Sequence, residues 1–239
     1  MNENTGIEIK NFSLTRGQKV LYRDFSITFG KNRTTALLAP SGTGKTSLLD
    51  SISGLLSYQA GTIECTENEK KVSISYLFQE PRLLPWATVL QNCILPLENL
   101  FSKGEAVKRA EYYLSLCNLL DRKNAFPNEL SGGERQRCAL ARTFAFPAPV
   151  LLMDEAFQSQ DVALKEQLLS LFKSILQKEP RTVVLVTHDI KEALLLADRI
   201  VVLQHEKNET TLKIFMDKNI DEINIEKIQE EITGLLSGV

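Results

Sequence analysis

Hydrophobic and polar residues alternate one by one through the first thirty positions of the chain. The runs Ile7–Lys10 and Phe25–Phe29 show this pattern clearly. A period of two is typical of strands that bury one face and expose the other. The pattern therefore predicts an antiparallel sheet at the start of the fold.

Farther along the chain, short apolar runs alternate with segments of helical periodicity. The apolar runs predict strands at Thr35–Leu38, Val72–Phe78, Val150–Met153, Thr182–Val186, Ile200–Leu203 and Thr210–Phe215. Strands that alternate with helices are typical of a largely parallel sheet covered by helices. The strand pattern disappears between about 80 and 141, and Glu105–Leu120 has apolar positions at helical spacing. This change of period predicts a helical insertion into an α/β core.

These patterns lead us to expect one α/β domain over 1–239. Its core would consist of about 1–79 and 142–205, its helical subdomain of about 80–141, and its C-terminal tail of about 206–239. The tail contains four apolar residues at roughly helical spacing, which predicts a packing helix: Ile223, Ile228, Ile232 and Leu235.

Composition narrows the class of protein. With 239 residues, 43% hydrophobic and 24% charged, the chain fits a globular domain and not a disordered or collagen-like one. A net charge of −2 predicts no nucleic-acid partner. The apolar runs fall short of the ~20 residues of a membrane span, and the polar start lacks a secretory signal, so we expect a cytoplasmic location. The four scattered cysteines predict neither a zinc site nor disulfides.

A glycine-containing loop joins the first predicted core strand to a helical run that begins at Ser47. It reads Ala39-Pro40-Ser41-Gly42-Thr43-Gly44-Lys45-Thr46. Such a loop can turn its N–H groups toward a triphosphate, with the lysine reaching the β- and γ-phosphates, the threonine hydroxyl ligating Mg²⁺, and Ser47 reaching the α-phosphate. An ordinary turn before a helix is the alternative. The glycines, lysine and threonine at the required spacing favour nucleotide binding, although Ala39 replaces the first glycine of the strict motif.

Acidic, imidazole and amide side chains follow three other predicted strands. Asp154 and Glu155 come after one strand, His188 after the second, and Gln79 after the third. Ligands of parallel sheets gather at the carboxyl ends of strands. We expect Asp154 to hold Mg²⁺, Glu155 to polarise the attacking water, His188 to contact the γ-phosphate, and Gln79 to ligate Mg²⁺ or orient water. Solvated acids and a structural histidine are the alternatives.

The segment Leu130–Arg137 precedes another helical run and contains two consecutive glycines. Ser131 and Glu134 fit a capping box at a helix start, which is a purely structural interpretation. A cap does not require Gly132 and Gly133, whereas glycines before an exposed helix N-terminus allow an anion to approach the backbone. A second phosphate-binding element in one chain indicates a site shared between two chains.

The order of these motifs resembles that of the ATP-binding subunits of ABC transporters over about Ile7–Leu203. The resemblance implies a P-loop NTPase cassette with a parallel-sheet core, an N-terminal antiparallel β subdomain and a helical subdomain. It also implies an ATPase that uses ATP and Mg²⁺ and works as a head-to-tail dimer, which we expect to be a homodimer. In such a dimer Ser131, Gly132, Gly133 and Asp161 would contact the partner's nucleotide.

The segment Leu83–Trp86 resembles importers of nitrate, sulfonate, taurine and related small molecules. This resemblance implies an energy-coupling subunit at the cytoplasmic face of the membrane, under a transmembrane permease. A separate extracytoplasmic solute-binding protein would deliver the solute to that permease. Trp86 would either anchor the permease or fill the junction between subdomains. A soluble ABC ATPase that acts on a non-transport assembly is the alternative function. A P-loop kinase or GTPase would leave Ser131–Gly133 unexplained.

Three departures from the family pattern concern the nucleotide site. Arg16 stands where the family has an aromatic residue stacked on adenine, and a guanidinium plane can also stack. The segment after Glu155 keeps chiefly Phe157 and Asp161 of the family's sequence. Together with Ala39, these changes predict a divergent but competent ATPase.

Overall fold

The computed structural model describes most of the chain, with gaps. The described residues are 5–40, 42–67, 70–157, 162–206, 209–215, 230, 232–234 and 236. They form two compact units, each assembled from segments far apart in the sequence. The first unit consists of Met1–Ile74, Pro149–Glu155 and Leu176–Val239, and the second of Ser75–Ala148 and Ala156–Ile175.

Two long strands at the start of the chain form an antiparallel pair in the first unit. β1 (Thr5–Arg16) pairs with β2 (Lys19–Gly30) on one side and with β4 (Ala60–Glu64) on the other. From Phe25 to Phe29, every second side chain of β2 is buried. The antiparallel sheet expected from the period of two is confirmed. A separate short pair follows, made of β5 (Thr66–Glu67) and β6 (Lys70–Lys71).

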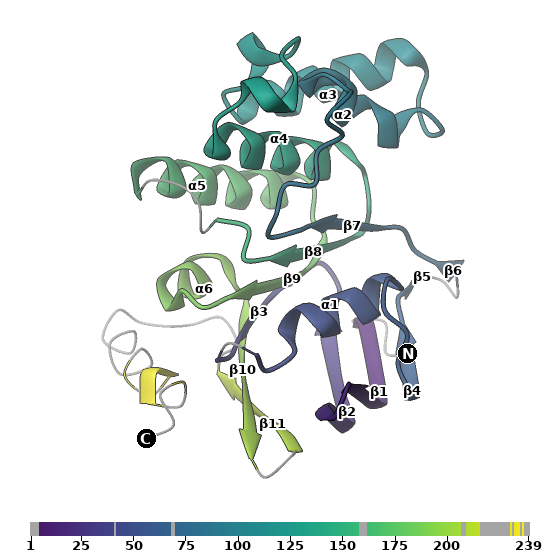
Figure 1. The fold of residues 1–239 in the computed structure, drawn as a ribbon, viewed down its shortest axis with the longest axis vertical. Helices are drawn as coiled ribbons and strands as arrows, with labels where there is room; N and C mark the ends of the chain where they lie inside the picture. Colours follow the sequence, from purple (N-terminus) through teal and green to yellow (C-terminus); the bar gives the residue numbers. More distant parts are fainter. Residues whose placement is uncertain are drawn as a thin grey trace. The chain divides into compact units, whose positions relative to one another are not determined.

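The larger sheet of the first unit has neighbouring strands in the order β11-β10-β3-β9-β8. Their bounds are β3 (Thr34–Leu38), β8 (Val150–Asp154), β9 (Thr182–Thr187), β10 (Arg199–Glu206) and β11 (Glu209–Phe215). All pairs are parallel except that of β10 with β11. Every residue of β3, β8 and β9 is buried, which accounts for their apolar sequences. Helices α1 (Lys45–Ser53) and α6 (Ile190–Leu196) follow β3 and β9 (Figure 1).

The parallel register brings three strand ends to one edge of this sheet. Leu38 of β3 pairs with Thr187 of β9, and Asp154 of β8 pairs with Val186 of β9. The chain therefore leaves these three neighbouring strands at levels that differ by about one residue, or roughly 3.3 Å. The loops that follow them carry the candidate chemistry of the first unit.

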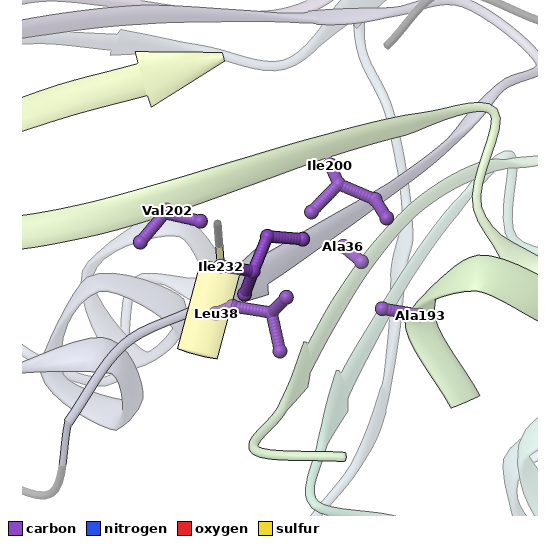
Figure 2. Close-up of a cluster of buried hydrophobic side chains, with 6 residues drawn as sticks. All are labelled: Ala36, Leu38, Ala193, Ile200, Val202 and Ile232. Atoms are coloured by element: carbon purple, nitrogen blue, oxygen red, sulfur yellow. The ribbon is translucent and has the colours of Figure 1, made fainter. Parts of the chain in front are cut away.

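The C-terminal tail contributes Ile232 to a buried apolar cluster of the first unit, and Leu236 packs against the same cluster. Figure 2 shows Ile232 among residues of β3, β10 and α6, all of them 0% exposed: Ala36, Leu38, Ile200, Val202 and Ala193. The backbone is helical at 230, 232–234 and 236, so the packing helix expected of the tail is confirmed at Ile232. The other three apolar positions on which that expectation rested lie outside the described residues: Ile223, Ile228 and Leu235.

The second unit is mainly helical. It contains most of β7 (Ile74–Leu77), α2 (Val89–Ile94), α3 (Lys103–Leu116), α4 (Gly132–Ala145) and α5 (Val162–Lys178), with short 3-10 helices at Leu95–Leu97, Leu120–Arg122 and Pro127–Glu129. Phe144 of α4 packs its ring against Tyr113 of α3 and Phe172 of α5. The residues 80–141, expected to be a helical insertion, lie in this unit.

Among the elements without a clear signal in the sequence are α2 and β4, and β7 is shorter than expected. α2 has six residues, too few to show a helical period, and β4 is exposed along most of its length and so lacks alternation. The strand predicted over Val72–Phe78 is restricted to Ile74–Leu77. The parallel sheet, the antiparallel sheet and the helical unit together confirm the expected fold class.

Gly61 generates a prediction about stability, because it lets β4 approach the backbone of β1. Its φ is +93°, and a Cβ atom there would lie 2.4 Å from the carbonyl oxygen of Lys10 and 2.5 Å from that of Asn11. We expect Gly61→Ala to lower the free energy of unfolding by about 2–4 kcal/mol, since backbone on both strands must move.

Urea unfolding of this variant checks the prediction, with Gly104→Ala as the matched control. Gly104 lies in α3, and its Cβ would meet no heavy atom within 4 Å. Alanine there should leave stability unchanged or raise it by about 0.5–1 kcal/mol. Equal effects of the two substitutions would contradict the close approach of β4 to β1.

Candidate functional site

The loop between β3 and α1 depends on two glycines with left-handed backbone. Gly42 has a φ of +77° and Gly44 a φ of +94°, a conformation that other residues rarely adopt. Gly44 is also the N-cap of α1 and offers no side-chain cap. The N–H groups of the first helical turn therefore remain available to an anion at this loop.

Lys45 folds back into the loop from the start of α1. Its side chain is 7% exposed, and Nζ donates hydrogen bonds to the carbonyl oxygens of Ala39 at 2.7 Å and Pro40 at 3.0 Å. Burial lowers the pKa of Lys45, while the carboxylates of Glu155 and Asp154 raise it. A phosphate oxygen, which is charged, is a stronger acceptor for this ammonium than either carbonyl.

Thr46 and Asp154 join the start of α1 to the end of β8. The Thr46 hydroxyl donates a hydrogen bond to Asp154 Oδ2 at 2.6 Å. Burial raises the pKa of Asp154; the Thr46 hydrogen bond opposes the rise, and the nearby carboxylates of Glu155 and Asp50 add to it. A bound cation would relieve this crowding of negative charge.

The chemistry of this pair fits Mg²⁺. Hydroxyl and carboxylate oxygens are the ligands that Mg²⁺ prefers, and the ion usually takes its remaining ligands from water and substrate phosphates. Thr46 and Asp154 supply one oxygen donor of each kind, already in contact with each other. A nucleotide in the neighbouring loop would supply the phosphates.

Glu155 and His188 follow β8 and β9 at the same sheet edge. Glu155 has a φ of +48°, which is uncommon for a residue other than glycine, and its N–H donates to the carbonyl oxygen of Val186 at 2.9 Å. Its Oε1 lies 3.8 Å from Nδ1 of His188, and their side chains are 19% and 62% exposed. Backbone strain of this kind clusters at functional sites. The pair can act on a water molecule or a ligand that enters from solvent.

Asp189 positions the loop that carries His188, a role that the sequence analysis did not assign. It is the N-cap of α6, where its Oδ1 accepts hydrogen bonds from the N–H groups of Lys191 at 2.8 Å and Glu192 at 3.2 Å. An aspartate directly before a helical run was the available signal.

The remaining predicted nucleotide-binding residues of the first unit lie around the same loop. Thr43 is buried and donates from Oγ1 to the carbonyl oxygen of Pro40 at 2.9 Å, and Ser47 is buried in α1. Arg16 is exposed at the end of β1, opposite Lys19 of β2. Two predicted site residues lie outside the described residues, Ser41 and Asp161.

Four further predicted site residues belong to the second unit: Gln79, which follows β7, and Ser131, Gly132 and Gly133 at the start of α4. Ser131 forms the capping box with Glu134, whose N–H donates to Ser131 Oγ at 3.2 Å. In return, the N–H of Ser131 donates to Glu134 Oε2 at 2.8 Å. These hydrogen bonds lower the pKa of Glu134. The capping box of the structural interpretation is thus present. Apart from its chain neighbours and the helix's own backbone, a Cβ atom at Gly132 would meet no heavy atom within 4 Å, so this side of the helix start is open.

Trp86 is 74% exposed and sits in a turn organised by one buried side chain, that of Asn92. Asn92 Oδ1 accepts from the N–H of Leu84 at 2.8 Å, and Nδ2 donates to three carbonyl oxygens at 3.0–3.2 Å: those of Leu84, Ala87 and Thr88. An indole with this exposure is available to a partner, which favours the anchor interpretation. Asn92 makes these hydrogen bonds only when the turn is folded, so nothing in the sequence indicated its role in organising the turn.

Comparisons with known proteins point in one direction. Residues 22–158 match the family described as ABC transporter. The aliphatic sulfonates import ATP-binding protein SsuB 1 of Pseudomonas syringae pv. tomato is 34% identical over 96% of this chain and 83% of its own length. The formylaminopyrimidine import ATP-binding protein ThiZ of Halalkalibacterium halodurans is 39% identical over 82% of this chain and 78% of its own.

Among solved structures, the chain is similar to the ATP-binding cassette MJ0796, a dimer in a post-hydrolysis state bound to ADP and phosphate. The TM-score is 0.79 at 28% identity, and the similarity covers 90% of this chain and 100% of that one.

The raised pKa of Asp154 generates a prediction about stability and pH. Ionising a carboxyl whose pKa is higher in the folded state costs folding free energy above the folded pKa, and this cost disappears below the unfolded value of about 3.9. Without nucleotide and Mg²⁺, Asp154→Asn should therefore raise the Tm at pH 7.5, by roughly 2–4 °C for each kcal/mol of folding free energy that ionised Asp154 costs. Near pH 4 the variant should lose this advantage.

Thermal unfolding across this pH range checks the effect, with the exposed Asp121→Asn as the control that should leave the Tm unchanged. An Asp154→Asn protein that is less stable than wild type at pH 7.5 would contradict the account of Asp154.

Proposed function

The chain belongs to the ABC transporter family of ATP-binding proteins, and we propose that it is the ATP-hydrolysing, energy-coupling subunit of an importer for a small solute. One observation carries the proposal: five groups of the required chemistry meet at one edge of the parallel sheet. They are Lys45, Thr46, Asp154, Glu155 and His188. The import names of the relatives support the direction of transport.

In this proposal each group has a separate task. The loop from Ala39 to Ser47 binds the phosphates through its N–H groups and Lys45, and Arg16 stacks on the base. Thr46, Asp154 and Gln79 would hold Mg²⁺, which neutralises phosphate charge when it is bound. Glu155 polarises the attacking water, and His188 contacts the γ-phosphate.

The second unit is proposed to complete the site of a partner subunit. Ser131, Gly132, Gly133 and Asp161 would contact the nucleotide held by the second ATP-binding subunit of a head-to-tail dimer. The open start of α4 and the dimeric state of MJ0796 support this arrangement. The homodimer is the simplest case for a chain that carries one cassette.

The further partners are a transmembrane permease and, indirectly, an extracytoplasmic solute-binding protein. Within the described residues, no helix has the length and apolarity needed to cross a membrane. We place the chain at the cytoplasmic face of the membrane, as a single domain with 80–141 as its helical subdomain, and without a nucleic-acid partner. The relatives are named for different solutes, so the nitrate, sulfonate and taurine class rests on the segment Leu83–Trp86 and the sulfonate names.

ATP hydrolysis is tested by removing the group assigned to the attacking water. Glu155→Gln should lower the ATPase rate at least about 100-fold, because general-base assistance is lost, while MgATP binding is retained. Glu98→Gln, an exposed acid of the second unit, is the control and should leave the rate unchanged. A Glu155→Gln protein that hydrolyses ATP at the wild-type rate would contradict the assignment of Glu155 to the attacking water.

The importer function is tested by isolating the tagged protein from its native membranes in mild detergent and identifying the chains that copurify. A polytopic permease should copurify, and Trp86→Ala should lower its recovery because the exposed anchor is lost. Leu55→Ala, which removes an exposed apolar side chain of the first unit, is the control. An active ATPase recovered only from the soluble fraction would favour the ABC ATPase of a non-transport assembly instead.

A further inference from the structure

We propose that Lys19 is a positioning residue of the phosphate-binding loop, an inference that rests on the proposed ATP-binding function of that loop. Lys19 Nζ donates a hydrogen bond to the carbonyl oxygen of Gly42 at 2.7 Å. The two residues are 23 positions apart in the sequence, and neither the motif nor the spacing of the loop includes Lys19. The lysine holds the loop from outside and thereby fixes the direction of a loop N–H group.

Peptide geometry links the carbonyl that Lys19 holds to the N–H that follows it. In a planar trans peptide, the C=O of Gly42 and the N–H of Thr43 point in opposite directions. An ammonium that keeps this carbonyl on the outer side therefore keeps the N–H of Thr43 on the other side. Gly42, next to this peptide, has a φ of +77°, a backbone conformation that glycine adopts without steric cost but can also leave easily. A partner for the carbonyl reduces that freedom.

β2 is packed against the loop at a second point, which places Lys19 within reach. A Cβ at Gly44 would lie 3.0 Å from Cε2 of Tyr22 and 3.3 Å from Cβ of Leu21. Tyr22 is 1% exposed and its ring packs against Phe25, so this part of β2 is anchored in the core. Lys19 therefore extends from the anchored strand to Gly42, while Tyr22 and Leu21 lie against Gly44.

Two lysines thus hold the same loop by its carbonyl groups, but their positions differ. Lys45 is buried and donates to Ala39 and Pro40, whereas Lys19 is exposed and donates to Gly42. Lys45 can exchange its carbonyl partners for phosphate oxygens. Lys19 keeps the loop in the conformation that binds the ligand. It is not the lysine of the phosphate-binding motif, which is Lys45. Its cross-strand neighbour Arg16 lies at the same end of the hairpin.

The test measures the affinity of the purified full chain for MgATP and for inorganic triphosphate by calorimetry. Lys19→Met should weaken both to the same extent, about three- to tenfold, because the loop that binds phosphate loses its preset direction. Lys19→Arg, which keeps a donor and the charge, should restore most of the affinity. Lys10→Met is the matched control, since it removes another exposed lysine roughly 20 Å farther along β1 from Arg16.

Each outcome decides one question. Unchanged affinity for both ligands in Lys19→Met, with strong loss in Lys45→Ala, would overturn the role of Lys19 and leave ATP binding intact. Weaker MgATP binding with unchanged triphosphate binding would overturn it too, because Lys19 would then act on the nucleoside. Unchanged binding in Lys45→Ala would contradict the proposed nucleotide site itself. A Tm equal to that of wild type shows that Lys19→Met is folded.

Discussion

The candidate site depends on the parallel register of β3, β9 and β8. Because Leu38 pairs with Thr187 and Asp154 pairs with Val186, the three strands end at nearly one level. Three loops that are far apart in the sequence then begin side by side. A shift of register by two residues would move one strand end by about 7 Å and separate its side chain from the others. The fully buried strands resist such a shift, since every residue of β3, β8 and β9 is packed on both faces.

The charges gathered at this edge are arranged for a ligand more than for the stability of the empty protein. Lys45 is buried with carbonyl partners, and Asp154 is buried beside two further carboxylates, so burial works against the charged form of both. A polyphosphate with Mg²⁺ provides what each lacks: anionic oxygen atoms for Lys45 and positive charge for Asp154. The free energy that the empty site gives up is thereby recovered as affinity and as stabilisation of the bound state.

The sequence predicted the long, buried elements of both units better than the short or exposed ones, for physical reasons. Buried strands such as Val150–Asp154 have unbroken apolar sequences, and the chemistry that follows them sits at predictable strand ends. Exposed or short elements such as β4 and α2 carry no such period. Contacts that depend on the folded hairpin had no sequence signal, and the hydrogen bond from Lys19 to Gly42 is one of them. The left-handed backbone of Glu155 was also beyond prediction, because a residue other than glycine rarely adopts it and glutamate as a residue type carries no signal for it.

The most direct test of the site is an experimental structure of the chain with Mg²⁺ and a non-hydrolysable ATP analogue. We expect Lys45 Nζ to leave the carbonyl oxygens of Ala39 and Pro40 and to donate to the β- and γ-phosphates. We also expect Mg²⁺ beside Thr46 and Asp154, with Glu155 facing the γ-phosphate. A nucleotide bound away from the loop, with Lys45 still on both carbonyl groups, would contradict the account.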